Sequence, residues 1–269
     1  MNSHETKSEL PLKHNRVFVI AILFVYAIPA IIFTIDTMIS HGTNSTLKDL
    51  SVVIAGVAFF CVAMWGLVEE KIPFDTIGLT LTGIKEAVLL ALVGWGIVVL
   101  AGYLVIVINN RDPGGLFYKS APYILQYWVF VGVTEELLFR GYILTRLIKF
   151  WAVRNKVLGQ ILAVVVASFL FATAHIPQRM YQVARGDMTL AGVLASVVLL
   201  SIVGIVFSYL FLRTKNIILV GLIHGAVIVP LIGVGEDAFL PVIIIAILYI
   251  ESFLILKRGR LQRNLSKVR

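Results

Sequence analysis

The chain has 269 residues, of which 59% are hydrophobic and 14% are charged, and its mean hydropathy is +0.95. A soluble domain is about 45–50% apolar and about one quarter charged. The composition therefore excludes a disordered tail, a collagen-like fibre, a disulfide scaffold and a soluble nucleic-acid-binding domain, despite a net charge of +8. The excess of apolar side chains predicts a protein whose solvent is the lipid bilayer.

Runs of about 20 mostly apolar residues predict membrane-spanning helices. Such runs occur at residues 17–35, 51–68, 87–108, 123–145, 158–176, 189–212, 216–234 and 238–256. We therefore expect an all-α fold, a polytopic membrane helix bundle of about eight transmembrane helices with an active site buried within it. The expected organisation is a cytoplasmic N-terminal segment (1–16), a single membrane domain (17–256) and a basic cytoplasmic tail (257–269).

The distribution of Lys and Arg predicts the orientation of this bundle, because cytoplasmic loops carry an excess of both. With both termini inside, the inner segments hold most of the 23 Lys and Arg residues, and the outer loops hold few, Arg179 and Arg185 among them. We therefore expect a multi-pass integral protein of the cell (plasma) membrane with both termini cytoplasmic. The basic tail requires only the anionic headgroups of the bilayer, and no nucleic acid, as a partner.

Charged residues interrupt the fourth apolar run, which contains Glu135, Glu136 and Arg140. A charge at the centre of a membrane helix costs at least about 2.5–3.5 kcal/mol, so a function or a partner is expected. Glu136 and Arg140 are four residues apart, which places them on one helix face as an ion pair. Glu135 lies about 100° around the helix from Glu136, where it can face the bundle interior as a general base. The alternative is that all three charges form one packing network that locks helices together.

Two of the five histidines lie in apolar runs, His175 at the end of the fifth and His224 in the seventh. A Glu and two His residues from three helices can activate a water and stabilise an oxyanion, or bind a divalent metal such as zinc. Both arrangements carry out hydrolysis. The cofactor therefore stays open between a metal and none, with Glu135, His175 and His224 as the ligands if a metal is used.

These residues, in this order, resemble the motifs of the CPBP family. The motifs are Glu135-Glu136-x-x-x-Arg140, Phe171-x-x-x-His175 and His224. The family comprises CAAX proteases and bacteriocin-processing (Abi) intramembrane proteases, relatives of the CAAX prenyl endopeptidase Rce1. The resemblance implies a protease-like core at residues 123–234. It also implies an endopeptidase that cuts near the C-terminus of a membrane-anchored peptide or protein, for example a prenylated one.

The resemblance also implies roles for the residues that match. Glu135 is the essential carboxylate and works with His175 to activate the attacking water. Glu136 and Arg140 are the supporting ion pair, and His224 lines the oxyanion site. Family names call these enzymes metalloproteases, and a metal-free glutamate mechanism is equally compatible with these residues.

One position departs from the family pattern, because Ile228 stands where an Asn follows the last histidine by four residues. An Ile side chain can neither donate to an oxyanion nor bind a metal, and losing one such donor costs roughly 2.7–4 kcal/mol in the transition state. Either the enzyme tolerates the change, or another donor such as Thr173 or Ser168 substitutes. Otherwise the chain is a catalytically inactive member, acting in bacteriocin self-immunity or as a membrane regulatory scaffold. A small transporter that uses the buried charges is a third hypothesis.

Overall fold

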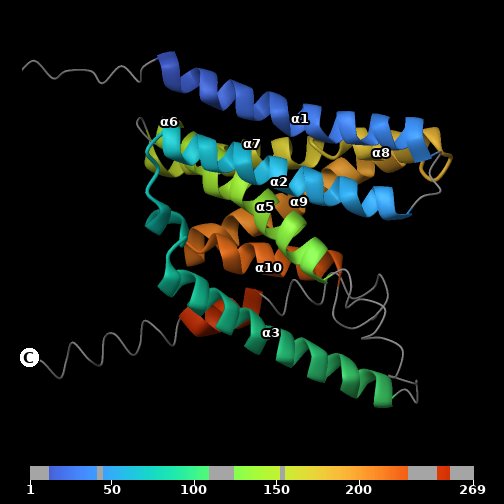
Figure 1. The fold of residues 1–269 in the computed structure, drawn as a ribbon. Coiled ribbons are helices and arrows are strands. Elements are labelled where there is room, and N and C mark those ends of the chain that lie inside the picture. The colour runs from blue at the N-terminus through green and yellow to red at the C-terminus, as the bar shows by residue number, and fades with distance from the viewer. Residues whose placement is uncertain (1–11, 41–44, 109–123, 152–154, 230–246, 255–269) are drawn as a thin grey trace, which may run out of the picture.

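The computed structural model of the chain describes residues 12–40, 45–108, 124–151, 155–229 and 247–254. Every regular element within these residues is a helix, and the helices pack into one bundle (Figure 1), which confirms the predicted all-α membrane fold. The basic tail 257–269, most of the N-terminal segment and the first half of the eighth predicted span lie outside the described residues.

The first helices of the chain are α1 (Leu12–Ser40), α2 (Ser45–Glu69), the short 3-10 helix η1 (Phe74–Ile77) and α3 (Leu81–Ile108). The later ones are α7 (Lys156–Thr173), α8 (Ile176–Ala184), α9 (Leu190–Thr214) and α10 (Ile217–Ile228). Within the described residues, five helical stretches are long and apolar enough to cross a membrane: Arg16–Thr34, Leu50–Glu69, Phe74–Leu100, Lys156–Ala184 and Leu190–Thr214. The chain is therefore an integral membrane protein.

The fourth predicted span is helical but has an unusual backbone. It consists of the π-helix η2 (Leu125–Val133), the α-helical turn α5 (Thr134–Glu136), the π-helix η3 (Leu137–Leu144) and α6 (Thr145–Trp151). A π-helix bonds residue i to residue i+5, is rare and is found mostly at functional sites. The two adjacent glutamates occupy the α-helical turn between the two π-helices.

In the seventh predicted span (216–234), helix α10 ends at Ile228, and residues 230–234 lie outside the described residues. Its 12 residues cover about 18 Å, which is less than the roughly 30 Å hydrocarbon core of a bilayer. At its other end, the Asn216 side chain caps the helix by accepting a hydrogen bond of 3.1 Å from the backbone N–H of Leu219. The helix therefore has a capped start at Asn216, and by itself it is shorter than a membrane-spanning helix.

Glycines bring η2, the helix immediately before α5, close to α10. A Cβ atom added at Gly132 would overlap the carbonyl oxygen of Gly221, and one added at Gly221 would lie 2.5 Å from the Cα of Val133. A Cβ at Gly225 would overlap the backbone of Trp128. Only glycine permits this separation of the two backbones. The glycines thus place α10 directly beside the helical turn that carries the glutamates.

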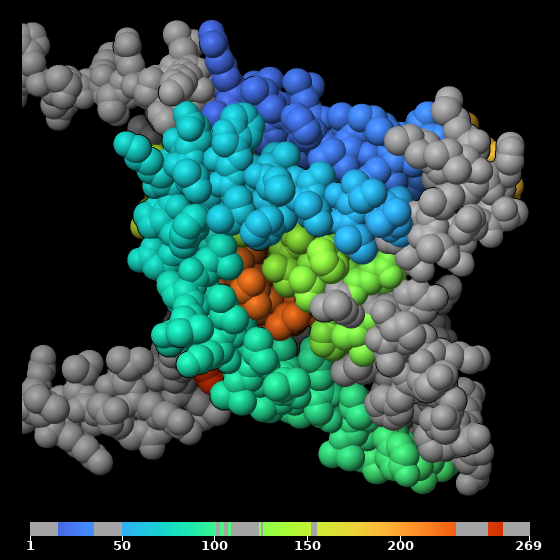
Figure 2. All heavy atoms as spheres, in the orientation of Figure 1, coloured from blue at the N-terminus to red at the C-terminus, as the bar shows by residue number. Residues whose placement is uncertain are grey.

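The outward surfaces of the bundle are apolar, as a lipid-facing surface must be. Leu92 on α3, Val157 on α7 and Leu194 on α9 are 65%, 70% and 71% exposed. Figure 2 shows the surface hollowed between α2 and α3, where parts of η2, α5 and α10 are visible. Helix α3 is joined to the rest in part by Trp95, whose ring centroid lies 5.1 Å from that of Trp128 on η2.

Candidate active site

The predicted ion pair within the fourth span is present. Arg140 Nη1 donates a hydrogen bond of 2.8 Å to Glu136 Oε1, and neither residue has any exposed surface. Buried charges of opposite sign offset part of each other's desolvation cost when they also form hydrogen bonds. The pair therefore neutralises one of the two adjacent carboxylates.

His224 belongs to the same charged cluster. Its Nδ1 lies 2.9 Å from Glu136 Oε1, the same oxygen that accepts from Arg140. A carboxylate oxygen accepts, so Nδ1 carries the proton in this bond. In the neutral ring, Nε2 is then an acceptor, and His224 donates through Nε2 only when the ring is doubly protonated.

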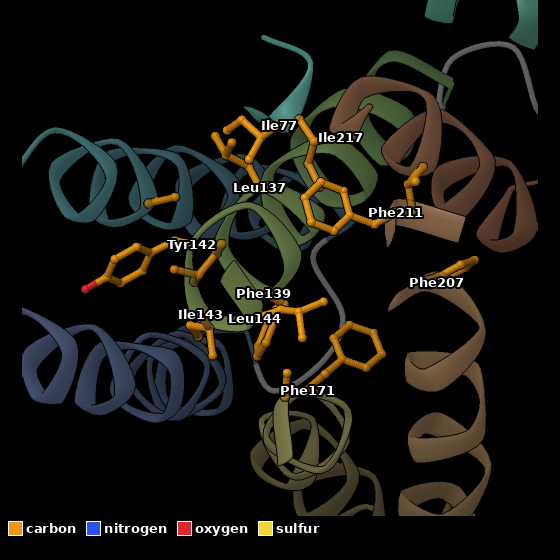
Figure 3. Packing of buried hydrophobic residues seen from close by; sticks show 14 of the residues in the cluster. Ile77, Leu137, Phe139, Tyr142, Ile143, Leu144, Phe171, Phe207, Phe211 and Ile217 are labelled. Carbon is orange, nitrogen blue, oxygen red and sulfur yellow. The ribbon is translucent and has the colours of Figure 1, made fainter. Parts of the chain in front are cut away.

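Aromatic rings and a backbone carbonyl hold the guanidinium of Arg140. Its Nη2 donates to the carbonyl of Gly204 at 3.0 Å, and its central carbon lies 4.5 Å from the ring centroid of Phe171 and 5.7 Å from that of Phe207. Such cation–π contacts are strongest where water is excluded. Phe171 and Phe207 come from α7 and α9 (Figure 3), so Arg140 joins three helices at one point.

Glu135 lies outside this cluster and lines a cavity of about 360 Å³ inside the bundle. The cavity is also lined by His175, His224 and Ile228, so the structure brings the predicted glutamate and both predicted histidines to one space. Among the residues that the structure describes, Glu135 Oε2 is buried without a hydrogen-bond partner. A carboxylate oxygen in that state can accept a proton from a bound water.

His175 lies at the junction between α7 and α8, as the residue immediately before α8. Its Nδ1 donates a hydrogen bond of 2.8 Å to the carbonyl of Phe171. Because a carbonyl only accepts, this bond places the proton on Nδ1 and leaves Nε2 as an acceptor in the neutral ring. The ring is further held by an edge contact with Phe171, with 4.9 Å between the ring centroids.

The substitute oxyanion donors expected from the sequence do not line this cavity. Thr173 bonds to the backbone of its own helix and to Tyr26 on α1, where the two hydroxyl oxygens are 2.7 Å apart. Ser168 packs against Gly204 on α9 instead. Ile228 itself reaches the cavity and is 41% exposed. The expectation that Thr173 or Ser168 replaces the missing donor is therefore wrong, because both face neighbouring helices.

The predicted metal ligands do not fit a three-ligand site in this arrangement. Within the described part of the chain, no three side chains of His, Cys, Asp or Glu gather closely enough to hold a metal ion. Each histidine donates through Nδ1 within the protein and leaves Nε2 open, which is compatible with metal binding, so the mismatch lies in the spacing of the ligands. Metal-dependent chemistry therefore stays a prediction.

The fold and the cavity define an integral membrane helix bundle with a carboxylate and two imidazoles at one internal site. Residues 117–229 match the family model described as type II CAAX prenyl endopeptidase Rce1-like. The match confirms the resemblance to CAAX proteases and covers the segment that carries Glu135, His175 and His224. The family is a protease family, which supports a hydrolase role in general. No curated protein and no solved structure matches the chain.

The sequence did not indicate one polar residue of the cavity wall, Arg179. It lies in a predicted outer loop of the sequence, whereas in the structure it lies on α8, in the wall of the same cavity as Glu135. It follows His175 by four residues, so helical spacing would have placed the two side chains on one face. A helix after the fifth apolar run was not expected, since the run ends at residue 176.

Proposed function

We propose that the protein is an intramembrane endopeptidase that hydrolyses a peptide bond of a membrane-anchored peptide or protein. The observation that carries this proposal is the shared cavity, in which the Glu135 carboxylate and the imidazoles of His175 and His224 face one space within the bundle. The match of this segment to a protease family is independent support. A prenylated protein is one member of the proposed substrate class.

In the proposed reaction, Glu135 is the general base and His175 orients the water through Nε2. Glu135 takes one proton from the water while the water oxygen forms a bond to the carbonyl carbon of the peptide. When the C–N bond breaks, the same proton passes to the leaving amine. The products are a carboxylic acid and an amine, and Glu135 returns to its ionised form.

His224 and the Glu136–Arg140 pair have a different proposed role. His224 faces the cavity and can stabilise the negative oxygen of the intermediate by donating from Nε2, which requires the doubly protonated ring. Its bond to Glu136 fixes the orientation of the ring. Glu136 and Arg140 are fully buried, so they act on the reaction through His224 and through helix packing rather than by contact with substrate.

The test is to compare the termini of membrane proteins in cells that express the wild-type protein or Glu135→Gln. We expect new termini that appear with the wild type and disappear with Glu135→Gln. Asp187→Asn is the matched control, because it makes the same chemical change on an exposed side chain after α8. Peptides that span the cleavage sites are then tested in proteoliposomes. Termini that persist in Glu135→Gln would contradict the proposal.

Ile228 supports a second candidate, a non-catalytic family member that acts in immunity or as a scaffold. The side chain enters the cavity at the position where the resemblance implies an Asn donor. A non-catalytic member would retain its cellular phenotype in Glu135→Gln and in His175→Gln. A peptidase would lose the phenotype in both variants while keeping normal amounts of folded protein.

We also propose that the protein lies in the plasma membrane with both termini cytoplasmic. The cavity is lined by the later part of α1, near Pro29, and by the earlier part of α2, near Ser51. If α1 crosses the membrane, both parts lie toward the side opposite the N-terminus. In this orientation the cavity lies in the outer half of the bundle. A reporter active only in the cytoplasm, fused after Arg269, should be active, and an inactive fusion would contradict this orientation.

A further inference from the structure

Arg179 is a cation in the wall of the candidate active site, and no carboxylate of the described residues forms an ion pair with it. It lies on α8 and is partly buried, and its Nε atom is buried without a hydrogen-bond partner among the described residues. Nη1 donates to the side chain of Gln182 at 3.1 Å. A guanidinium carries five N–H donors, so most of its capacity is not used by this bond.

The carboxylates of the described residues around the cavity are not paired with Arg179. Among the described residues that line it, Glu135 is the one acidic side chain, and no ion pair joins Glu135 to Arg179. Glu136 is already engaged by Arg140. A half-buried cation without a charged partner is unfavourable, and an anionic ligand would relieve this cost. Arg presents a fork of donors that fits a carboxylate.

The position of Arg179 relative to His175 limits where this anion can lie on a substrate. The backbone N–H of Arg179 donates to the carbonyl of His175 at 3.1 Å, so the two residues are separated by one helical turn. One turn of four residues corresponds to about 6 Å along the axis. An extended peptide covers that distance with about two residues.

We infer that Arg179 binds a carboxylate of the substrate peptide about two residues from the scissile bond. This inference rests on the proposed peptidase function. Arg179 would then determine substrate specificity at the part of the cavity that α8 lines. The carboxylate is either the C-terminus of the peptide or the side chain of an Asp or Glu. Both have the same chemistry toward the guanidinium.

The binding test uses full-length protein carrying Glu135→Gln, so that no probe is cleaved. The probes are four N-palmitoylated peptides that differ at two places only. The C-terminus is either a free acid or an amide, and one internal residue is either Asp or Asn. We expect the probe with a correctly placed carboxylate to bind on the order of 10- to 100-fold more tightly than the probe without any carboxylate. Tighter binding of the free-acid probes would identify the C-terminal carboxylate as the ligand, and tighter binding of the Asp probes would identify the side chain.

The same measurement is repeated with Arg179→Gln and with Arg185→Gln added to Glu135→Gln. Arg185 is the matched control, because it lies at the end of α8, pairs with Asp187 and does not line the cavity. We expect Arg179→Gln to abolish the preference for the carboxylate, Arg179→Lys to restore part of it and Arg185→Gln to leave it intact. Absence of a preference, or a preference that survives Arg179→Gln, would overturn the inference.

Cleavage of the same probes separates this inference from the proposed function. Wild-type protein should cleave the tightly bound probe, and Arg179→Gln should raise KM for that probe with little change in kcat. If Arg179-dependent binding is observed but no probe is cleaved in a Glu135-dependent way, the carboxylate site stands and the peptidase proposal fails. If cleavage depends on Glu135 but is indifferent to the carboxylate, the peptidase proposal stands and the carboxylate site fails.

Discussion

His224 and Glu136 are 88 residues apart in the chain and are joined by a buried hydrogen bond of 2.9 Å. Because the same Glu136 oxygen accepts from Arg140, one carboxylate holds together the fourth span and α10. Glu135, the neighbouring residue, takes no part in these bonds. Replacement of Glu136 and replacement of Glu135 should therefore affect the stability of the protein differently.

We expect Glu136→Ala to destabilise the protein strongly, because it leaves the fully buried Arg140 without its counter-charge. Breaking a buried ion pair in this way typically costs about 3–5 kcal/mol. Glu135→Ala should change stability little, since Glu135 is partly exposed to the cavity. Thermal unfolding of the purified proteins in detergent measures both effects, and equal losses of stability in the two variants would contradict the assignment.

Ile228→Asn should raise kcat for a cleaved peptide. The side chain lines the cavity and is 41% exposed, so a polar replacement sacrifices little buried packing. An added oxyanion donor can contribute up to about 100- to 1,000-fold in kcat, and we expect an increase of about tenfold or more. Ile228→Leu is the control, with no expected gain. An unchanged kcat in Ile228→Asn would mean that another group already donates to the oxyanion.

Gly221→Ala should lower both the yield of folded protein and its melting temperature. The added Cβ would lie 2.5 Å from the Cα of Val133, the last residue of η2, so α10 would have to move away from η2. Overpacking of this kind costs about 1–3 kcal/mol or more. Gly96→Ala on α3 is the matched control, because no atom lies within 4 Å of its added Cβ. Similar behaviour of the two variants would show that the contact between η2 and α10 is not tight.

A second buried ionic contact should prove important for stability. The Tyr142 hydroxyl donates to Glu70 Oε1 at 2.7 Å, and Arg146 Nε lies 3.0 Å from Glu70 Oε2, which ties η3 and α6 to the end of α2. Tyr142→Phe removes one hydrogen bond to a charged group and should cost about 1.5–3 kcal/mol. Arg146→Met should cost more, because it leaves the Glu70 charge buried. Chemical or thermal unfolding that ranks the two variants in the opposite order would refute this account.

The features that depend on local spacing could be predicted from the sequence. The apolar runs predicted the helices because a helix exposed to lipid needs a continuous apolar surface. The four-residue separation of Glu136 and Arg140 predicted their ion pair, because such residues lie on one face of a helix. The π-helical backbone around them leaves this contact intact, with 2.8 Å between the paired atoms.

The features that depend on helix packing could not be predicted in the same way. Nothing in the spacing of His224 and Glu136 indicates their hydrogen bond, since it depends on how closely the glycines let α10 approach. The end of α10 at Ile228 has no signal in the sequence, because the apolar residues continue beyond it. Arg179 was assigned to a loop because polar residues after His175 end the apolar run, whereas those residues form the amphipathic helix α8.

The contact between Trp95 and Trp128 provides an intrinsic fluorescence probe of the position of α3. The two indoles lie on α3 and η2 with 5.1 Å between ring centroids, and the Trp128 Nε1–H also donates to the carbonyl of Val229 at the end of α10 at 3.1 Å. Any separation of α3 from η2 would change the environment of both rings. The intrinsic fluorescence of these two tryptophans, out of four in the chain, would therefore follow movements of α3 in real time without an attached dye.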